Sequence, residues 1–216
     1  YIRQLDSVHG GHIRLCLIDQ MPTFFYDALR QCLAASYRDN PLIHFSIDVQ
    51  SPESMLEKLL SNESDIGVGY FGSFPPLLTF QPAFIEKQVV CCGREHRLFY
   101  ESEGLTFEDL EQNYPWIKRG YITDLSINHV RPKTLSATTY HMDATAQLIL
   151  AGHHVGYLPN DLAKRYEEMG LMKILLPNEA SYEVKHHWAY RENLHKQVAE
   201  FLSQMMHLLL KSSPKL

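Results

Sequence analysis

Residues 44–70 read HFSIDVQSPESMLEKLLSNESDIGVGY, and this stretch decides the fold class of the chain. Residues 44–49 alternate between apolar and polar side chains, which predicts a strand. Residues 51–53, Ser-Pro-Glu, are a strong helix start, because serine caps a helix, proline fits its first position and a carboxylate favours its positive end. Residues 65–70 form a mostly apolar run, which predicts a buried strand. A strand, a helix and a strand in this order predict a parallel pair joined by a right-handed crossover.

The same alternation continues along the whole chain. A first strand is expected at residues 13–18, followed by a helix at residues 23–37 with Thr23 as its N-cap. Further strands are predicted at residues 84–93, 115–117, 135–139, 155–158, 171–176 and 182–191, and further helices at residues 143–151, 160–168 and 194–210. Alternation of this kind is typical of an α/β fold with a parallel sheet.

The composition excludes two classes of protein. Lys and Arg total 20 against 25 Asp and Glu, and a net charge of −5 without a basic cluster speaks against nucleic-acid binding by this chain alone. No apolar run approaches the roughly 20 residues of a membrane span. The four cysteines show no CxxC spacing, which favours buried free thiols in a reducing compartment, and we expect a cytoplasmic location.

Several short motifs occur in a set order. Gly11 precedes the first strand, Pro41 precedes the second, and the serine-capped helix is followed by Asp-Ile-Gly-Val at residues 65–68. Residues 96–98 read HRL, and residues 151–159 read AGHHVGYLP. In this order the motifs resemble the effector-binding domain of LysR-type transcriptional regulators, whose corresponding runs are commonly His-Pro-Leu and Ala-Gly-Leu-Gly-Ile-Ala-Leu-Leu-Pro.

The resemblance implies an α/β fold of two Rossmann-like lobes joined by two crossover strands, like that of type 2 periplasmic binding proteins. Lobe I would comprise residues 11–93 and 192–216, lobe II residues 94–191, and residues 1–10 the end of a linker. The resemblance also implies that the effector binds in the cleft between the lobes. The family's N-terminal helix-turn-helix is expected to be absent from this chain.

Candidate effector contacts follow from a rule that is independent of the family. In open parallel sheets, ligands bind outside the carboxyl ends of the strands, where loops and helix N-termini converge. The residues that this rule selects are Asp19, Gln20, Met21, Thr23, Gln50, Ser51, Tyr70, Phe71, Lys118, Arg119, Gly120, Tyr121, Tyr140, His141, Met142, Tyr157 and Asn160. The candidates retained from this set are Asp19, Gln20, Met21, Ser51, Tyr70, Phe71, Arg119, Tyr121, His141, Met142 and Tyr157, and the resemblance implies effector contacts in the same loops. For Ser51 a role as a helix cap alone stays open, and for Asp19 a role as a solvated loop carboxylate.

The candidate set is rich in aromatic rings and poor in cations. Asp19 would repel a carboxylate ligand in a site of low dielectric constant, whereas tyrosine and phenylalanine rings can stack on a planar group. We therefore expect a nucleobase-like, nucleoside-like or amine-bearing effector. Two alternatives stay open, since half of the rings could belong to the core and Arg119 could pair with an anion.

No metal, cofactor or catalytic site is expected. The histidine pairs at residues 153–154 and 186–187 lie on predicted strands, where neighbouring side chains face opposite ways. The chain has no Gly-x-Ser-x-Gly elbow of a hydrolase, and Gly67-x-Gly69 lacks the third glycine of a dinucleotide-binding motif. Binding rather than turnover is therefore the expected activity.

The leading hypothesis is the small-molecule sensor of a bacterial transcriptional regulator. Its expected partners are the effector, further copies of the chain in a homodimer or tetramer, and DNA through an N-terminal domain that this chain lacks; no membrane partner is expected. The dimer surface would include the exposed side of helix 23–37, with Phe24, Ala28 and Ala35. The alternatives are a freestanding solute-binding protein of a transport system and an enzyme on the same fold.

Overall fold

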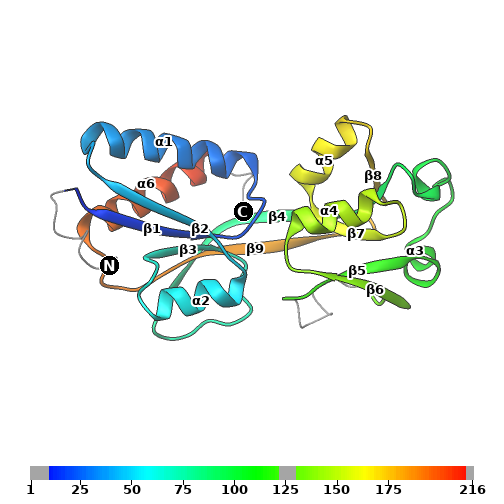
Figure 1. Cartoon of the computed structure of the whole chain (residues 1–216), viewed down its shortest axis with the longest axis horizontal. Helices are drawn as coiled ribbons and strands as arrows, with labels where there is room; N and C mark the ends of the chain where they lie inside the picture. Colours follow the sequence, from blue (N-terminus) through cyan, green and yellow to red (C-terminus); the bar gives the residue numbers. More distant parts are fainter. Residues whose placement is uncertain (1–9, 122–129, 213–216) are drawn as a thin grey trace. The chain divides into compact units, whose positions relative to one another are not determined.

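The computed structural model describes residues 10–121 and 130–212, and Figure 1 shows their strands and helices. The chain divides into two compact units: unit 1 comprises residues 1–85 and 185–216, and unit 2 comprises residues 86–184. Both divisions fall within long strands, β4 (Thr79–Gly93) and β9 (Ser181–Tyr190), a few residues before the lobe boundaries expected from the sequence. The expected linker, residues 1–10, lies outside the described residues except for Gly10.

Unit 1 contains the parallel strands predicted from the sequence. β1 (His12–Leu17) pairs in parallel with β2 (His44–Val49) on one side and with β3 (Ile66–Gly69) on the other. β9 pairs with β3 in the antiparallel direction and sets His187 opposite Gly69. The two predicted crossovers are therefore confirmed, and three parallel strands end at the same edge of this sheet.

Helices cover both faces of the unit 1 sheet. α1 (Thr23–Asp39) and α6 (Lys196–Ser212) pack together on one face and enclose a core that includes Leu15 and Phe25. α2 (Pro52–Leu60) covers the other face, where Met55 and Leu59 pack against Cys16. Leu15 and Cys16 are neighbours on β1, so the alternation of a strand divides the apolar side chains between two cores.

The start of α1 differs from the expectation. Pro22 occupies the N-cap position and Thr23 is the first helical residue, and no side chain caps this helix end. Ser51, in contrast, caps α2 as predicted, because its Oγ accepts a hydrogen bond from the Ser54 backbone N–H at 3.3 Å. The expected exposure of Ala28 is wrong, because Ala28 is buried in the core below α1.

The strands of unit 2 pair in both parallel and antiparallel directions. β5 (Pro115–Arg119) is parallel to β6 (Thr134–Thr139) and to β7 (Val155–Pro159), whereas β4 runs antiparallel to β7 and to β8 (Met172–Leu175). Its helical segments are a short 3₁₀ turn (Arg97–Phe99), α3 (Phe107–Asn113), α4 (Met142–Leu150) and α5 (Asn160–Glu168). α4 is followed by Gly152, which has a left-handed φ of 80° and stops the helix as predicted. Among the described residues, no helix is long and apolar enough to cross a membrane.

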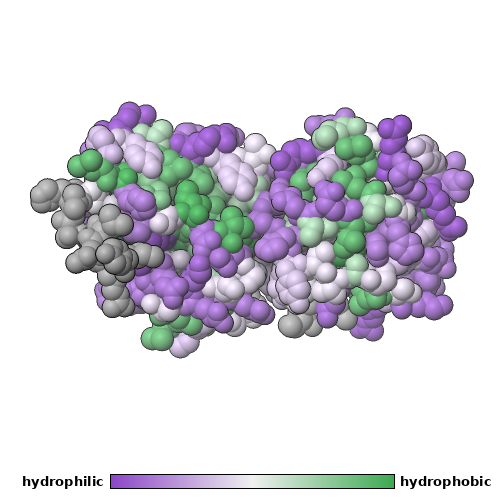
Figure 2. Space-filling model, in the orientation of Figure 1, coloured by the Kyte–Doolittle hydropathy of each residue, from purple (hydrophilic) through white to green (hydrophobic). Residues whose placement is uncertain are grey.

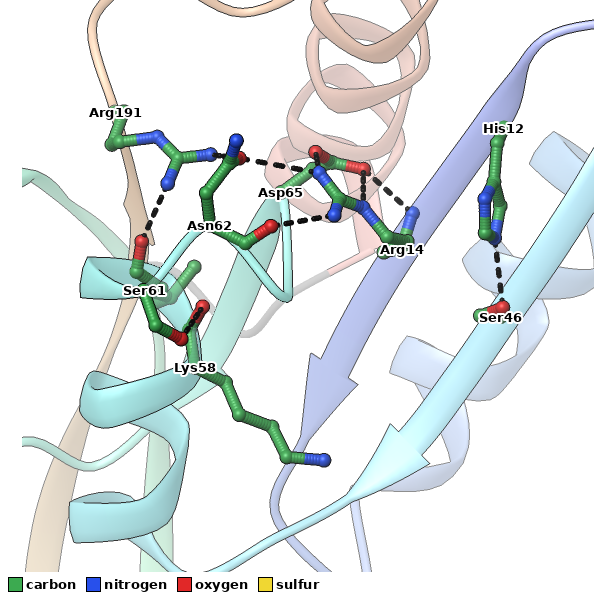
Figure 3. A network of polar contacts seen from close by, with 9 residues as sticks. His12, Arg14, Ser46, Lys58, Ser61, Asn62, Asp65 and Arg191 are labelled. Atoms are coloured by element: carbon green, nitrogen blue, oxygen red, sulfur yellow. Dashed lines mark hydrogen bonds and ion pairs between the residues drawn. The ribbon is translucent and has the colours of Figure 1, made fainter. Parts of the chain in front are cut away.

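A polar network ties the amino ends of β1 and β3 together (Figure 3). The Arg14 guanidinium contacts both Asp65 oxygens, at 2.5 and 3.1 Å, and the Arg14 backbone N–H donates to the same carboxylate at 2.8 Å. Arg14 also donates to the backbone oxygen of Asn62 at 2.6 Å, and the Asn62 side-chain oxygen accepts from Arg191. Arg191 in turn donates to the Leu59 carbonyl at 2.8 Å. The network thus joins two strands, the end of α2 and the residue after β9.

Replacing Asp65 by Asn should destabilise the protein. The change removes the charge that Arg14 faces, and we expect the free energy of unfolding to fall by about 1.5–3 kcal/mol, the range for hydrogen bonds to charged groups. Urea denaturation measures this loss. Asp27→Asn is the matched control, because Asp27 pairs with Arg30 on the exposed side of α1 and should cost less than about 1 kcal/mol. Equal effects of the two changes would contradict a structural role for Asp65.

Candidate effector site

The loop after β1 carries two half-buried polar candidates. Asp19 and Gln20 follow this strand after one intervening residue, Ile18, and Gln20 adopts a φ of 53°. A left-handed conformation costs a residue with a side chain on the order of 1 kcal/mol, and such strain is concentrated at binding loops. The conformation of Gln20 supports the choice of this loop as part of a site.

Two other candidates in unit 1 are core residues. Met21 is buried in the core between the sheet and α1, and Phe71 is buried on the other face of the sheet, with its ring 5.3 Å from that of Phe80. Each adjoins a half-buried polar candidate, Gln20 in the first case and Tyr70 in the second. Met21 and Phe71 therefore anchor their loops, while Gln20 and Tyr70 remain at the edge of the sheet.

The end of β2 is held by charges that the sequence reasoning did not select. Gln50 donates from Nε2 to both Asp48 oxygens at 3.0 Å, and Lys58 binds the same carboxylate. The hydrogen bonds from Lys58 and then Gln50 hold the pKa of Asp48 below its usual value. Ser51 contacts the Ser54 hydroxyl at 3.2 Å as well as capping α2. The Asp48 carboxylate is therefore neutralised and hydrogen-bonded by its neighbours at this end of the sheet. Ser51 remains the candidate effector contact here.

Arg119 lies at the centre of a buried polar cluster at the end of β5. It is only 8% exposed, and it donates from Nη2 to Gln88 Oε1 at 2.7 Å and to the Tyr157 carbonyl at 3.0 Å. Its Nη1 lies 3.4 Å from the Tyr182 hydroxyl, and Gln88 donates to Glu86 at 2.7 Å. The guanidinium is therefore engaged by groups of unit 2 itself, which weakens the alternative that it serves as the receptor for an anion.

The remaining candidates of unit 2 fall into three settings. Tyr157 is buried, its ring centroid lies 4.8 Å from that of Tyr182, and burial raises the pKa of its hydroxyl. Met142 is a core residue, whereas Tyr121 is half-buried against the same core. His141 is exposed and directly precedes α4. Tyr121 and His141 are thus the accessible candidates of this unit.

Glu86, Gln88 and Tyr182 were missed by the sequence reasoning. Glu86 and Gln88 stand two residues apart in β4, on either side of the exposed Lys87, which places them on one face. That spacing is a signal that could have found them, because a polar pair within a buried strand needs partners. Tyr182 carries no comparable signal, since its approach to Arg119 depends on the pairing of distant segments.

The four cysteines have packing roles. All are free and buried, as the sequence predicted. Burial raises the pKa of Cys16 and Cys32 to about 11 and that of Cys92 to about 12, and it raises the pKa of Cys91 as well. Because the thiolate is the reactive form, these side chains are unreactive at neutral pH. In residues 10–121 and 130–212, no group of three or more His, Cys, Asp or Glu side chains is placed to hold a metal ion.

A shallow groove lies on unit 1 away from the candidate residues. It encloses about 480 Å³ beside α6, and its lining includes Tyr190, Leu202 and Met206. Tyr190 pairs with Ile66 at the start of β3, so the groove lies at the edge opposite the carboxyl ends of the parallel strands. The groove and the candidate effector contacts are therefore separate features.

Comparison with known proteins identifies the family. A model of the LysR substrate binding domain matches residues 7–209, and the chain belongs to this family of effector-binding domains. The HTH-type transcriptional activator BauR of Pseudomonas aeruginosa is 23% identical over 190 residues, which are 85% of this chain and 60% of BauR. The chain thus spans less than two thirds of the length of this relative.

Solved regulatory domains share the fold. The effector-binding domain of QuiR in complex with shikimate matches with a TM-score of 0.78 at 17% identity, over 95% of this chain and 100% of that chain. The regulatory domain of CcmR from Synechocystis PCC6803 in complex with 2-PG matches with a TM-score of 0.71 at 17% identity, over 94% of this chain and 100% of that chain. A mutant of the OxyR2 regulatory domain from Vibrio vulnificus matches with a TM-score of 0.72 at 11% identity, over 94% of this chain and 96% of that chain. These likenesses confirm the predicted α/β fold of the type 2 periplasmic-binding kind.

Arg119→Met tests whether the buried cluster stabilises unit 2. The change leaves the Gln88 and Tyr157 oxygens without their buried donor, and we expect a loss of about 1.5–3 kcal/mol in the free energy of unfolding, the range for hydrogen bonds to charged groups. Urea denaturation followed by tryptophan fluorescence measures it. The exposed neighbour Lys118 is the control, and Lys118→Met should change stability by less than about 0.5 kcal/mol. An unchanged midpoint for Arg119→Met would contradict the anchoring role.

Proposed function

We propose that this chain is the sensor of a bacterial DNA-binding transcriptional regulator and that its effector contacts the loops at the carboxyl ends of the strands. The observation that carries this proposal is membership of the LysR substrate binding domain family over residues 7–209. The accessible polar groups at the strand ends, including Asp19, Gln20 and Tyr121, support it. The regulatory domains of QuiR and CcmR, which are bound to shikimate and 2-PG, support a small molecule as the effector.

The charges at these ends favour an amine-bearing or nucleobase-like effector. Asp19 is a half-buried carboxylate, while the one buried arginine among the candidates, Arg119, already faces acceptors within unit 2. A carboxylate that is partly withdrawn from water is stabilised by an N–H or O–H donor. Tyr70 and Tyr121 add aromatic rings that can pack against a planar group.

The proposed activity is binding that shifts a conformational equilibrium. An effector that prefers one state of the domain raises the population of that state, and this population controls how the DNA-binding parts of the whole regulator are presented. A freestanding solute-binding protein would share the fold, but the curated relative BauR is a transcriptional activator, which favours the regulator. Buried free thiols support a reducing compartment such as the cytoplasm.

An apolar surface on unit 1 supports self-association. Tyr37 on α1 and Ile47 on β2 are 47% and 44% exposed, and Leu42 and Val49 are also exposed. Figure 2 shows hydrophobic atoms over β2 and beside α1, among a mostly neutral and hydrophilic surface. Among the described strands β2 pairs with β1 alone, which makes it an edge strand of this part of the chain, and exposed apolar edges invite pairing with another chain. A second copy of the chain is the proposed occupant.

Ile47→Glu should disrupt the proposed dimer. A charge at the centre of an apolar interface would have to be desolvated without a partner, so we expect the species larger than 25.0 kDa to be replaced by one of 25.0 kDa. Sedimentation velocity at tens of micromolar resolves the two. Leu77→Glu, at an exposed loop position of the same unit, is the control and should leave the dimer intact. A wild-type protein that sediments only as a monomer overturns the proposal.

A thermal-shift screen against a panel of metabolites tests the sensing function. A ligand at 100 times its dissociation constant adds about 2.7 kcal/mol of stability to the state that binds it, which gives a readable shift. The panel should contain nucleobases, nucleosides, amines and simple di-acids. If none of these classes raises the melting temperature, the proposed effector chemistry is wrong.

Asp19→Asn tests whether the effector is an amine or nucleobase or, instead, an acid. The change keeps the size and one acceptor but removes the charge, so the affinity for such a ligand should fall by about 1.5–3 kcal/mol, the range for a charge-assisted hydrogen bond. Calorimetry measures the change. Asp39→Asn, at the exposed end of α1, is the control. If the wild type binds a di-acid tightly and Asp19→Asn leaves that affinity unchanged, Asp19 is a solvated loop residue.

A further inference from the structure

We propose that Tyr140 is a pre-positioned stacking surface for a planar group of the effector, and that Gly120 is its positioning residue. This inference rests on the proposed sensing function, and it gives specific roles to two residues, Gly120 and Tyr140, that the strand-end rule selects. Tyr140 is 58% exposed and directly follows β6, while Gly120 directly follows β5. The two strands are parallel neighbours, with Arg119 paired with Thr139, so the ring stands at the carboxyl edge of the unit 2 sheet.

The ring of Tyr140 lies directly on the backbone of Gly120. A Cβ added at Gly120 would overlap the ring carbons Cε1 and Cζ of Tyr140 and would lie 2.8 Å from Cδ1. Only a residue without a side chain leaves room for the ring in this position. The backbone of Gly120 does not itself need glycine, because its φ is outside the left-handed region. The glycine therefore serves the placement of the ring.

The backbone on both sides of Tyr140 is held by one threonine of α4. The Thr145 hydroxyl lies 2.7 Å from the Thr139 hydroxyl and donates to the His141 carbonyl at 3.1 Å. Both threonines are buried, and the Gly120 backbone N–H donates to the Thr139 carbonyl at 2.8 Å. The residues before and after Tyr140 are thus fixed to the same side chain, and the base of Tyr140 has little freedom to move.

An exposed aromatic side chain that is fixed in this way loses less conformational entropy on binding a ligand than a freely rotating one. A solvated tyrosine loses rotamer entropy when it binds, whereas a ring already held in one place avoids most of that cost. The Cδ1, Cε1 and Cζ side of the Tyr140 ring lies against Gly120, and more than half of the residue remains accessible. A planar ring such as a nucleobase can stack on an aromatic side chain through its own π-face.

The test uses adenine as the planar probe and cyclohexylamine as a non-planar probe, with binding followed by NMR titration of the protein. We expect adenine to shift the Gly120 amide and the Tyr140 ring resonances. Tyr140→Leu should weaken adenine binding about fivefold, in the range of an aromatic pair, and should leave cyclohexylamine binding unchanged. Tyr140→Phe, which keeps the ring, should retain the affinity for adenine. Tyr100→Leu is the matched control, because Tyr100 is 70% exposed elsewhere in unit 2.

Gly120→Ala tests the positioning role without removing the ring. The added methyl must displace Tyr140, so adenine binding should weaken as it does in Tyr140→Leu, and the double variant should show no further loss. Two NMR signals report the contact directly. The ring-current shift of the Gly120 Hα protons should be lost in Tyr140→Leu, and the Tyr140 ring resonance should move in Gly120→Ala. Additive losses in the double variant would overturn the positioning role.

Three outcomes would overturn the inference while leaving the sensing function standing. One is adenine binding that does not perturb Tyr140 or is insensitive to Tyr140→Leu. Another is a change of sedimentation in Tyr140→Leu with unchanged adenine affinity, which would place the ring in a protein contact. The third is a wild-type protein that binds no adenine but is stabilised by another member of the metabolite panel. Failure of the whole panel would instead count against the proposed effector chemistry itself.

Discussion

The ion pair between Arg14 and Asp65 is the interaction on which the arrangement of unit 1 depends. It joins β1 and β3 at their amino ends, and the Asp65 backbone N–H adds a 2.9 Å bond to the Arg14 carbonyl. Asn62 and Arg191 extend the same network to the turn after α2 and to the residue after β9. With the amino ends held in register, the carboxyl ends of these strands fall at one level. The loops that carry Asp19 and Tyr70 therefore emerge side by side.

Unit 2 is organised around a different kind of centre. The partly buried ion pair of unit 1 lies at the amino ends of its strands. In unit 2, strand β5 ends instead at a buried guanidinium, since Arg119 is 8% exposed and donates to Gln88 and the Tyr157 carbonyl. A buried charge demands a complete set of acceptors, so the edge of this sheet is tightly specified. Gly120 and Tyr140 directly follow the paired residues Arg119 and Thr139, so their positions are fixed as well. Each unit thus supplies accessible groups at the carboxyl ends of its strands: the Asp19 carboxylate in unit 1, and the rings of Tyr121 and Tyr140 in unit 2.

Most strands and helices could be predicted from the sequence, although α3 was missed and β4 starts five residues before the predicted strand. The contacts between distant segments could not be predicted. The Ser-Pro-Glu start of α2 and the Gly152 stop of α4 are local signals, and both were confirmed. The start of α1 was misplaced because Thr23 is a good cap by type, yet Pro22 takes that position. The partners of Arg119 come from β4, β7 and β9, and their approach depends on sheet order. A pattern along the chain reports which face a residue occupies but not which strand lies beside it.

The buried cysteines make the protein convenient for spectroscopy. Since the native thiols are buried and protonated at neutral pH, a cysteine introduced at an exposed position would be the preferred site of a maleimide dye. Two such positions, one in each unit, would accept a donor and an acceptor fluorophore without removal of Cys16, Cys32, Cys91 or Cys92. Energy transfer between them could then follow the response to an effector in single molecules, with the native core left unaltered.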